Sequence, residues 1–257
     1  MTFFSSKKKI ADSVIAFALV LLIGPVQAGA AELINIQFQS KSEWNQYDPP
    51  YSGAAVIGGA GDTWNQLTAA SGTSSSLVNS AGVQTNTSIS WTGDGLFSSG
   101  NGFSKQPESA LMTSYLYSHG LQTITFSKLQ ENSTYNIYIY TQGAGDGKGR
   151  ILTVGGTQIN GGTETSKPMD PWATTFISGQ NYLTLTGATN STGVLSITYS
   201  AIGTSGGRET GFSEADINGI QLMQASGSVP EPSTYVLMGI GGLLCAFKLK
   251  RFSKSEC

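Results

Sequence analysis

The chain contains 257 residues with a formal net charge of −2, and only 12% of its residues are charged. Residues 32–228 hold thirteen acidic and seven basic residues, so this part alone carries about −6. An acidic body without a basic stripe argues against nucleic acid and anionic membrane surfaces as partners. Both cysteines, Cys245 and Cys257, lie outside these residues, so we expect a body without disulfides or thiolate metal sites.

Residues 1–30 have the three-part pattern of a secretory signal peptide. Lys7–Lys9 forms a basic start, Val14–Ile23 is an apolar stretch, and small residues follow it. Cleavage of the A-x-A type fits after Ala28 and after Ala30. With cleavage, the Sec machinery exports everything after this segment; the alternative is an uncleaved anchor.

Residues 31–228 are predicted to form one all-β domain. Short runs of β-branched and aromatic residues alternate with polar residues, and Gly, Asn and Ser separate the runs. Such spacing favours an antiparallel β-sandwich or jelly roll. The expected strands are Leu33–Gln39, Thr123–Phe126, Tyr135–Tyr140, Ile151–Val154, Trp172–Ile177, Tyr182–Leu185, Val194–Tyr199 and Ile217–Leu222.

One short helix is expected within this domain. Pro107 suits the first turn of a helix, and apolar residues follow with i, i+4 spacing, as in Leu111 and Tyr115. We therefore predict a helix over residues 107–116. The Gly- and Ser-rich segment Gly58–Gly82 fits long loops and weak strands equally well.

Two stretches of the body resemble a known β fold. The stretch from Phe126 to Tyr140 is similar to the L-x-x-x-x-x-Y-x-hydrophobic-Y-x-Y hairpin of galactose-binding-like jelly rolls. Ile217–Leu222 is similar to the final strand of that family. The resemblance implies a jelly-roll fold. Because one fold serves many functions, it does not by itself imply sugar binding.

No catalytic residue is predicted, although two motifs resemble parts of enzymes. Gly203–Gly207 resembles the G-x-S-G-G around a serine-protease nucleophile, and His119 with Asp146 or Asp170 would complete the order His, Asp, Ser. His119 does not lie in a strand-ending histidine motif, however, and the glycines fit a plain turn. Gly143–Gly149 lacks the G-x-x-x-x-G-K frame of a phosphate-binding loop and fits a hairpin loop instead.

Aromatic and acidic residues supply the remaining candidate sites. Most tryptophans in a sandwich belong to its core, but an exposed one can stack on a sugar. The candidate glycan contacts are Trp44, Trp64, Trp91 and Trp172. Glycine-flanked aspartates offer oxygen ligands to a structural calcium ion, although aspartate in such turns usually serves the turn itself. These aspartates are Asp62, Asp94 and Asp146. We predict no other metal and no cofactor.

Residues 229–257 read as a short motif, an uncharged apolar run and a basic end. As a helix, the run Tyr235–Phe247 would be about 20 Å long, shorter than the roughly 30 Å hydrocarbon layer. A single transmembrane helix over Ser233–Phe252 spans the layer if basic side chains reach up to the head groups. The basic residues that mark its cytoplasmic end are Lys248, Lys250, Arg251 and Lys254. The alternative is a C-terminal core helix, but such a helix has one apolar face, not apolar residues all round.

This order of features resembles the PEP-CTERM sorting signal of exopolysaccharide-producing bacteria. In that family an exosortase-type membrane peptidase reads the motif, which here is Val229, Pro230, Glu231 and Pro232. The resemblance implies a precursor held in the cytoplasmic membrane, with its body on the periplasmic side, that later reaches the cell surface or the extracellular medium. We therefore predict an exported, non-catalytic surface or matrix protein. A carbohydrate-binding module for exopolysaccharide is the first alternative, and a secreted hydrolase is the second.

Overall fold

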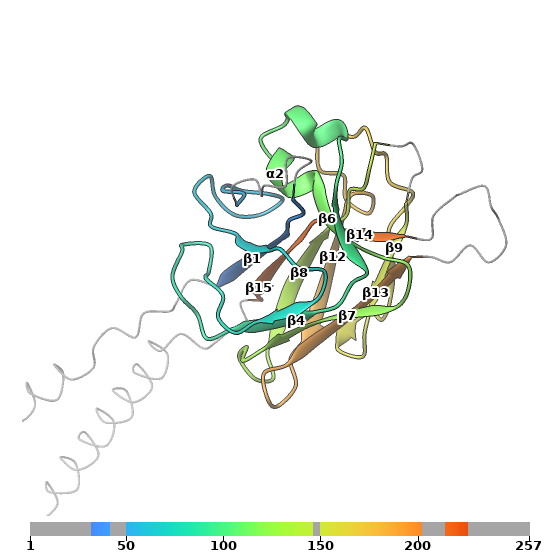
Figure 1. Cartoon of the computed structure of the whole chain (residues 1–257). Helices are drawn as coiled ribbons and strands as arrows, with labels where there is room; N and C mark the ends of the chain where they lie inside the picture. The colour runs from blue at the N-terminus through green and yellow to red at the C-terminus, as the bar shows by residue number, and fades with distance from the viewer. Residues whose placement is uncertain (1–31, 42–49, 146–149, 202–213, 226–257) are drawn as a thin grey trace, which may run out of the picture. The chain divides into compact units, whose positions relative to one another are not determined.

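Two six-stranded β-sheets make up most of the structure, a computed structural model of the chain (Figure 1). It describes residues 32–41, 50–145, 150–201 and 214–225. All of them belong to one compact unit, Ala31–Gly227. The predicted signal peptide and the predicted tail lie outside the described residues.

Sheet 1 has the strand order β10-β12-β8-β15-β1-β2. Its neighbouring strands are antiparallel, except that β1 and β2 are parallel. The strands of sheet 1 are β1 (Leu33–Phe38), β2 (Asn65–Leu67), β8 (Thr134–Tyr140), β10 (Ile159–Asn160), β12 (Tyr182–Ala188) and β15 (Gly219–Gln224).

Sheet 2 has the order β11-β9-β13-β7-β4-β3 and is antiparallel throughout. Its strands are β3 (Gly72–Ser74), β4 (Ser88–Trp91), β7 (Gln122–Ser127), β9 (Leu152–Gly155), β11 (Glu164–Thr165) and β13 (Leu195–Ala201). A third, antiparallel sheet has the order β14-β6-β5. Its strands are β5 (Gly95–Ser98), β6 (Ser114–Ser118) and β14 (Ala215–Ile217).

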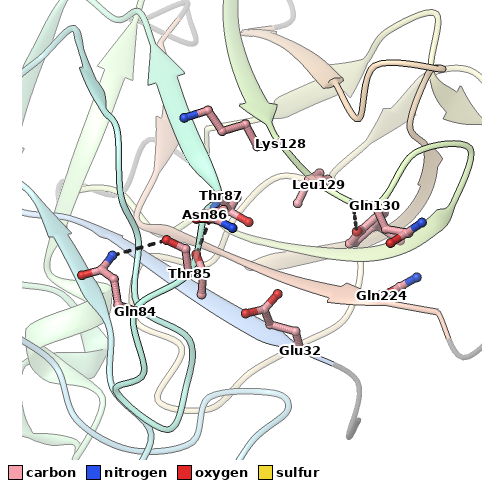
Figure 2. A pocket seen from close by; sticks show the side chains of 10 residues that line it. Glu32, Gln84, Thr85, Asn86, Thr87, Lys128, Leu129, Gln130 and Gln224 are labelled. Atoms are coloured by element: carbon pink, nitrogen blue, oxygen red, sulfur yellow. Dashed lines mark hydrogen bonds between the residues drawn. The ribbon is translucent and has the colours of Figure 1, made fainter. Parts of the chain in front are cut away.

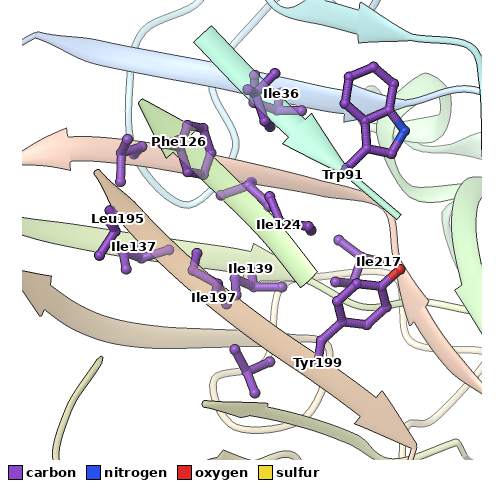
Figure 3. Packing of buried hydrophobic residues seen from close by; sticks show 14 of the residues in the cluster. Ile36, Trp91, Ile124, Phe126, Ile137, Ile139, Leu195, Ile197, Tyr199 and Ile217 are labelled. Atoms are coloured by element: carbon purple, nitrogen blue, oxygen red, sulfur yellow. The ribbon is translucent and has the colours of Figure 1, made fainter. Parts of the chain in front are cut away.

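The apolar residues of sheets 1 and 2 share one core (Figure 3). Strand alternation brings Ile36 of β1 into one cluster with Ile124 of β7 and Ile197 of β13, and all three are fully buried. Phe38 of β1 meets Trp91 of β4 edge to face, with ring centroids 6.4 Å apart. Each such side chain contributes about 2 kcal/mol by leaving water, so this core stabilises the body without disulfides.

A second apolar cluster covers part of the outer face of sheet 1. Tyr140 of β8 belongs to it, and the other members come from the segment before β2, from the 3₁₀ helix η1 (Gly102–Lys105) and from α2 (Ser109–Met112). Asn101 caps η1, because its Oδ1 accepts a hydrogen bond from the Phe103 N–H at 2.9 Å. The cluster consists of Tyr51, Trp64, Phe103, Leu111, Met112 and Tyr140.

Most expected strands are confirmed to within a few residues at their ends, and the all-β class with a short helix is confirmed with them. The expected strand Trp172–Ile177 is wrong. Asp170 turns the chain there, because its Oδ1 accepts the N–H of Trp172 at 2.9 Å and its carbonyl accepts the N–H of Ala173. The expected strand Ile217–Leu222 divides at Asn218 into β14 and β15, which belong to different sheets.

The expected helix over residues 107–116 is longer than the observed one. Only Ser109–Met112 is α-helical, and Tyr115 lies in β6. Strand β6 reads Ser-Tyr-Leu-Tyr-Ser and pairs with β5 on one side and β14 on the other. Aromatic side chains with a partner strand on each side favour a strand, and this outweighs the i, i+4 spacing.

Two connections that the sequence suggested were hairpins cross between the sheets. Strand β7 belongs to sheet 2 and β8 to sheet 1, so the stretch from Phe126 to Tyr140 is a crossover. Gly143–Gly149 lies between β8 of sheet 1 and β9 of sheet 2, and residues 146–149 lie outside the described residues. The segment Gly58–Gly82 contains both loops and the short strands β2 and β3.

Candidate functional site

A polar pocket of about 430 Å³ opens where β1 begins and β15 ends (Figure 2). Glu32 and Gln224 line it beside these strand ends, Lys128 and Gln130 line it from the β7–β8 connection, and Gln84–Thr87 lines it from the segment before β4. Carboxylate, ammonium, amide and hydroxyl groups together suit hydrogen bonding to a polar ligand. Sequence reasoning missed this pocket, because its walls come from segments far apart in the chain.

Two of the candidate glycan contacts lie in the interior. Trp64 is 3% exposed and Trp91 is 6% exposed. Their indole N–H groups donate to the carbonyls of Gly53 at 2.9 Å and Ala69 at 2.8 Å. The prediction that these two tryptophans contact sugar is therefore wrong, because their ring faces are covered and their polar atoms are already satisfied. Trp44 lies outside the described residues.

Trp172 is the exposed candidate, with 62% of its surface open to solvent. It follows the turn at Asp170, between buried Pro171 and buried Ala173. Gly145 lies against its ring: a Cβ atom placed on that glycine would come within 2.9 Å of the indole Cη2. The aromatic ring is thus held on one side and open on the other.

His119 lies between β6 and β7 and contacts Asp94, the residue before β5. Asp94 Oδ2 accepts the His119 backbone N–H at 2.7 Å and lies 3.1 Å from Nδ1 of the same residue. The backbone N–H of His119 is the main cause that lowers the pKa of Asp94, and the imidazole adds to it. Asp170 serves the Trp172 turn instead, and neither Asp146 nor Gly203–Gly207 is among the described residues.

Among the described residues, no three His, Cys, Asp or Glu side chains are grouped in a way that could hold a metal ion. Of the aspartates considered for calcium, Asp94 organises the turn at His119, whereas Asp62 approaches Gly58. An added Cβ on Gly58 would come within 2.1 Å of Asp62 Oδ2, and this glycine has a φ of 102°. Asp62 and Asp94 therefore lie in tight turns, the ordinary place for aspartate beside glycine.

A buried ion pair joins the start of β9 to the third sheet. Arg150 Nε lies 3.2 Å from Asp216 Oδ2 and 3.8 Å from Glu214 Oε2, and Arg150 and Asp216 are both buried. Next to it, Asn218 donates from Nδ2 to the carbonyls of Met112, Ser114 and Gln142 at 2.9 to 3.1 Å. Sequence reasoning missed both; the one available signal was a charged or amide residue at the end of an apolar strand.

No helix among the described residues is long and apolar enough to cross a membrane. The expected transmembrane helix falls beyond residue 225 and is therefore not among them.

Comparison with known families identifies the C-terminal segment. A model of the PEP-CTERM protein-sorting motif matches residues 228–251. The match contains the predicted motif Val229-Pro230-Glu231-Pro232 and three of the four basic residues, with Lys254 beyond its end. The chain therefore carries a PEP-CTERM sorting motif, as predicted, and this motif implies an exported, membrane-anchored precursor.

The body is similar to several solved structures. The ANX2 ectodomain from Arabidopsis thaliana has a TM-score of 0.40 and 15% identity, over 79% of this chain and 54% of that one. A calcium-binding mutant of β-glucuronidase 2 from Bacteroides uniformis has a TM-score of 0.36 and 11% identity, over 76% and 26% of the two chains. This chain spans about half the length of that plant ectodomain. Likeness at these scores carries no conclusion about function. No curated protein sequence matches the chain.

Proposed function

We propose that the chain is an exported bacterial surface or matrix protein whose tail is recognised and processed by an exosortase-type membrane peptidase. The observation that carries this proposal is the sorting motif at residues 228–251, with Pro230, Glu231 and Pro232 at its start. In this proposal the Sec machinery exports the precursor, the C-terminal helix holds it in the cytoplasmic membrane, and processing releases the body on the outer side.

The fold supports processing at both ends of the body. Leu33 of β1 pairs with Met223 of β15, so the start of the first strand lies beside the end of the last strand. Removal of residues before 31 and after 228 would leave every pairing of sheets 1 and 2 in place. We also propose jelly-roll connectivity for the body, since the chain crosses between the sheets from β7 to β8 and again from β8 to β9.

The test is mass spectrometry of the mature termini in fractionated cells that express the wild-type chain or Glu231→Gln. We expect extracellular wild-type protein without the residues from Lys248 to Cys257, and Glu231→Gln protein that keeps them and stays with the membrane. The matched control is Glu164→Gln, because Glu164 is an exposed glutamate of β11. Extracellular protein with an intact C terminus, or normal processing of Glu231→Gln, would contradict the proposal.

We propose further that the body is not an enzyme. The single histidine has an aspartate partner, but that aspartate accepts a backbone N–H and shapes a turn. A screen of glycosidase, esterase and protease substrates should therefore show no turnover by the secreted body. Turnover that disappears in His119→Ala would contradict this proposal.

A further inference from the structure

We propose that Trp172 is the stacking platform of a glycan-binding site built from three loops, and that the ligand is a neutral polysaccharide. The site goes beyond sorting, because it concerns what the body does after release. The loops contain residues 99–106, 141–145 and 168–176, and they meet beside the cluster that covers sheet 1.

Backbone hydrogen bonds hold the three loops together. The N–H of Gly102 donates to the carbonyl of Pro171 at 2.9 Å, and the N–H of Gly145 donates to the carbonyl of Gly100 at 2.9 Å. The side chain of Gln142 donates to the carbonyl of Asp170 at 3.1 Å. Trp172 therefore extends from a fixed backbone, and a ligand would bind without first ordering a loop.

Two glycines allow this close approach. A Cβ atom on Gly102 would come within 2.4 Å of the Trp172 carbonyl oxygen, and one on Gly145 would come within 2.6 Å of the Gly100 carbonyl oxygen. The ring of Trp172 also lies against Gly145, so its position depends on the missing side chain there. Glycine at position 145 therefore leaves the space that the Trp172 ring occupies.

The buried side of the Trp172 loop anchors it to the body. Phe176 packs against Phe103 with ring centroids 5.5 Å apart and against Tyr140 at 5.3 Å. Pro171 and Ala173 are buried on either side of the exposed tryptophan. Because the indole of Trp172 stays largely exposed, it gains little burial on folding, so the stability of the body does not require it.

A sugar fits this surface better than a protein. Protein interfaces bury about 800 Å² on each partner around several apolar anchors. Among the residues that the structure describes, the other large exposed apolar residues, except Ile177, belong to separate elements: Val83 precedes β4, Phe97 is in β5, and Leu121 precedes β7. The sequence neighbours Asp170, Thr174 and Thr175 are exposed and polar. An exposed aromatic ring with exposed threonine and aspartate residues next to it in the sequence suits the apolar face and polar rim of a pyranose ring.

The charge of the body favours a neutral polymer. Residues 32–228 carry about −6, and Asp170 places a carboxylate two residues from the platform. Lys105 in the first of the three loops offsets the charge of Asp170, so a uronate-rich or sulfated chain would be repelled by the net charge of the body as a whole, whereas a neutral glycan would not.

The test is affinity electrophoresis of the secreted body in gels that contain polysaccharide. The probe is the extracellular polysaccharide of the cells that produce the protein, separated by anion exchange into neutral and acidic fractions. We expect the neutral fraction to retard the wild-type body and the acidic fraction to leave it unretarded. Trp172→Ala should weaken the retardation about tenfold or more, whereas Trp172→Tyr should keep part of it.

Four further measurements separate binding from folding. Trp172→Ala should melt within a few degrees of wild type, because the indole is largely exposed. Leu121→Ala removes an exposed apolar side chain elsewhere, 72% exposed, and should bind normally. Gly145→Ala should weaken binding while the sheets stay folded, because the added methyl group would come too close to both the Gly100 carbonyl and the Trp172 ring. Quenching of tryptophan fluorescence by iodide should fall when the neutral fraction binds, and Trp172→Phe should remove this protection.

Other results would overturn the proposal. They are equal retardation of wild type and Trp172→Ala, retardation by the acidic fraction alone, and no retardation by either fraction. A wild-type dimer that Trp172→Ala converts to a monomer would make Trp172 a protein contact instead. None of these results bears on the sorting motif, because the assay uses the released body.

Discussion

The outer faces of sheets 1 and 2 differ, although the strands behind them share one sequence pattern. On sheet 1, the polar positions Asn35, Gln37 and Gln221 are fully buried under the second apolar cluster. On sheet 2, Thr125 and Ser196 occupy the corresponding outward positions and remain partly open to water. Apolar and polar residues alternate in both cases, so the period alone does not tell a covered face from an open one.

The type of polar residue does separate the two faces. Gln221 donates from Nε2 to Asn35 Oδ1 at 2.9 Å and to the Ile57 carbonyl at 3.2 Å, and its Oε1 accepts the Tyr140 hydroxyl. A carboxamide donates and accepts at once, which suits a site without water. Hydroxyl residues predominate on the open face, where water is a partner. On the covered part of sheet 1 the outward polar residues are the amides Asn35, Gln37 and Gln221, whereas the amide Asn160 on the edge strand β10 is exposed, so residue type and place in the sheet together mark the covered face.

On the covered side, which is the outer face of sheet 1 with the second apolar cluster, Asn218→Ala should lower the free energy of unfolding most. The change leaves the carbonyls of Ser114 and Gln142 without this buried donor and the Gln142 N–H without its acceptor, whereas the Met112 carbonyl keeps Asn101 Nδ2 as a donor. Since each buried group without a partner costs about 1–3 kcal/mol, we expect the free energy of unfolding to fall by about 3 kcal/mol or more. Urea denaturation of the secreted body measures it. Asn160→Ala, on the exposed edge strand β10, is the control and should change little. Equal effects of the two changes would contradict the distinction between the faces.

A smaller effect is expected at the amide in the centre of the covered face. Gln221→Leu should cost about 2 kcal/mol, because it leaves Asn35 Oδ1 without a donor and the Tyr140 hydroxyl without an acceptor, whereas the Ile57 carbonyl keeps the Ala55 N–H. Tyr140→Phe should cost about 1 kcal/mol. The hydroxyl of Tyr140 also accepts the Val56 N–H at 3.0 Å, so part of its contribution is independent of Gln221. Both single mutants lose the hydrogen bond between Tyr140 and Gln221, so the double mutant should be less destabilised than the sum of the single mutants. Additive costs would show that the two side chains are not coupled.

Most of the strands could be predicted from the sequence, but their assignment to sheets could not. Alternation of Ile, Phe and Tyr identifies β7 and β8 locally. Whether two consecutive strands pair or cross to the other sheet depends on partners far along the chain, as when β8 pairs with β15. The helix at residues 109–112 was overestimated for the same reason, because β5 and β14 determine the structure of β6.

The sites were predictable to different degrees. The sorting motif is contiguous, so its order along the chain was sufficient to identify it. The four tryptophans were equivalent in the sequence, and only tertiary packing distinguishes Trp172 from Trp64 and Trp91. The contact between Gly145 and the Trp172 ring could not be predicted from the sequence, because Gly145 lies 27 residues earlier and belongs to another loop.

High pH should destabilise the folded body through the ionisation of buried tyrosines, two of which, Tyr51 and Tyr140, belong to the second apolar cluster. Burial raises the pKa of Tyr51 to about 12 from an ordinary value of 10.0, and the charges of Glu108 and Asp62 add to the shift. Burial also raises the pKa of Tyr140. A raised pKa means that the folded state keeps the neutral phenol, so this stabilisation is complete below pH 10 and is lost as the pH rises toward 12.

Denaturation of wild type and Tyr51→Phe between pH 9 and pH 12 tests this prediction. Tyr51→Phe should be less stable at pH 9, because it loses the hydrogen bond to the Ala54 carbonyl, but its stability should fall less steeply above pH 10. Parallel pH profiles would show that Tyr51 ionises as easily in the folded state as in the unfolded one.

The smallest effect is expected on the open face, at the hydroxyl pair of Thr125 and Ser196. These side chains lie 2.9 Å apart on neighbouring strands β7 and β13, and both are partly exposed. Water replaces a lost partner at such a site, so Ser196→Ala should change the free energy of unfolding by less than about 0.5 kcal/mol. Thr125→Val keeps the β-branched shape and should be equally mild. Urea denaturation beside Gln221→Leu gives the direct contrast, because the lost groups are polar in both cases. A cost at Ser196 as large as at Gln221 would mean that sheet 2 is covered as well, by residues outside those described or by a second molecule.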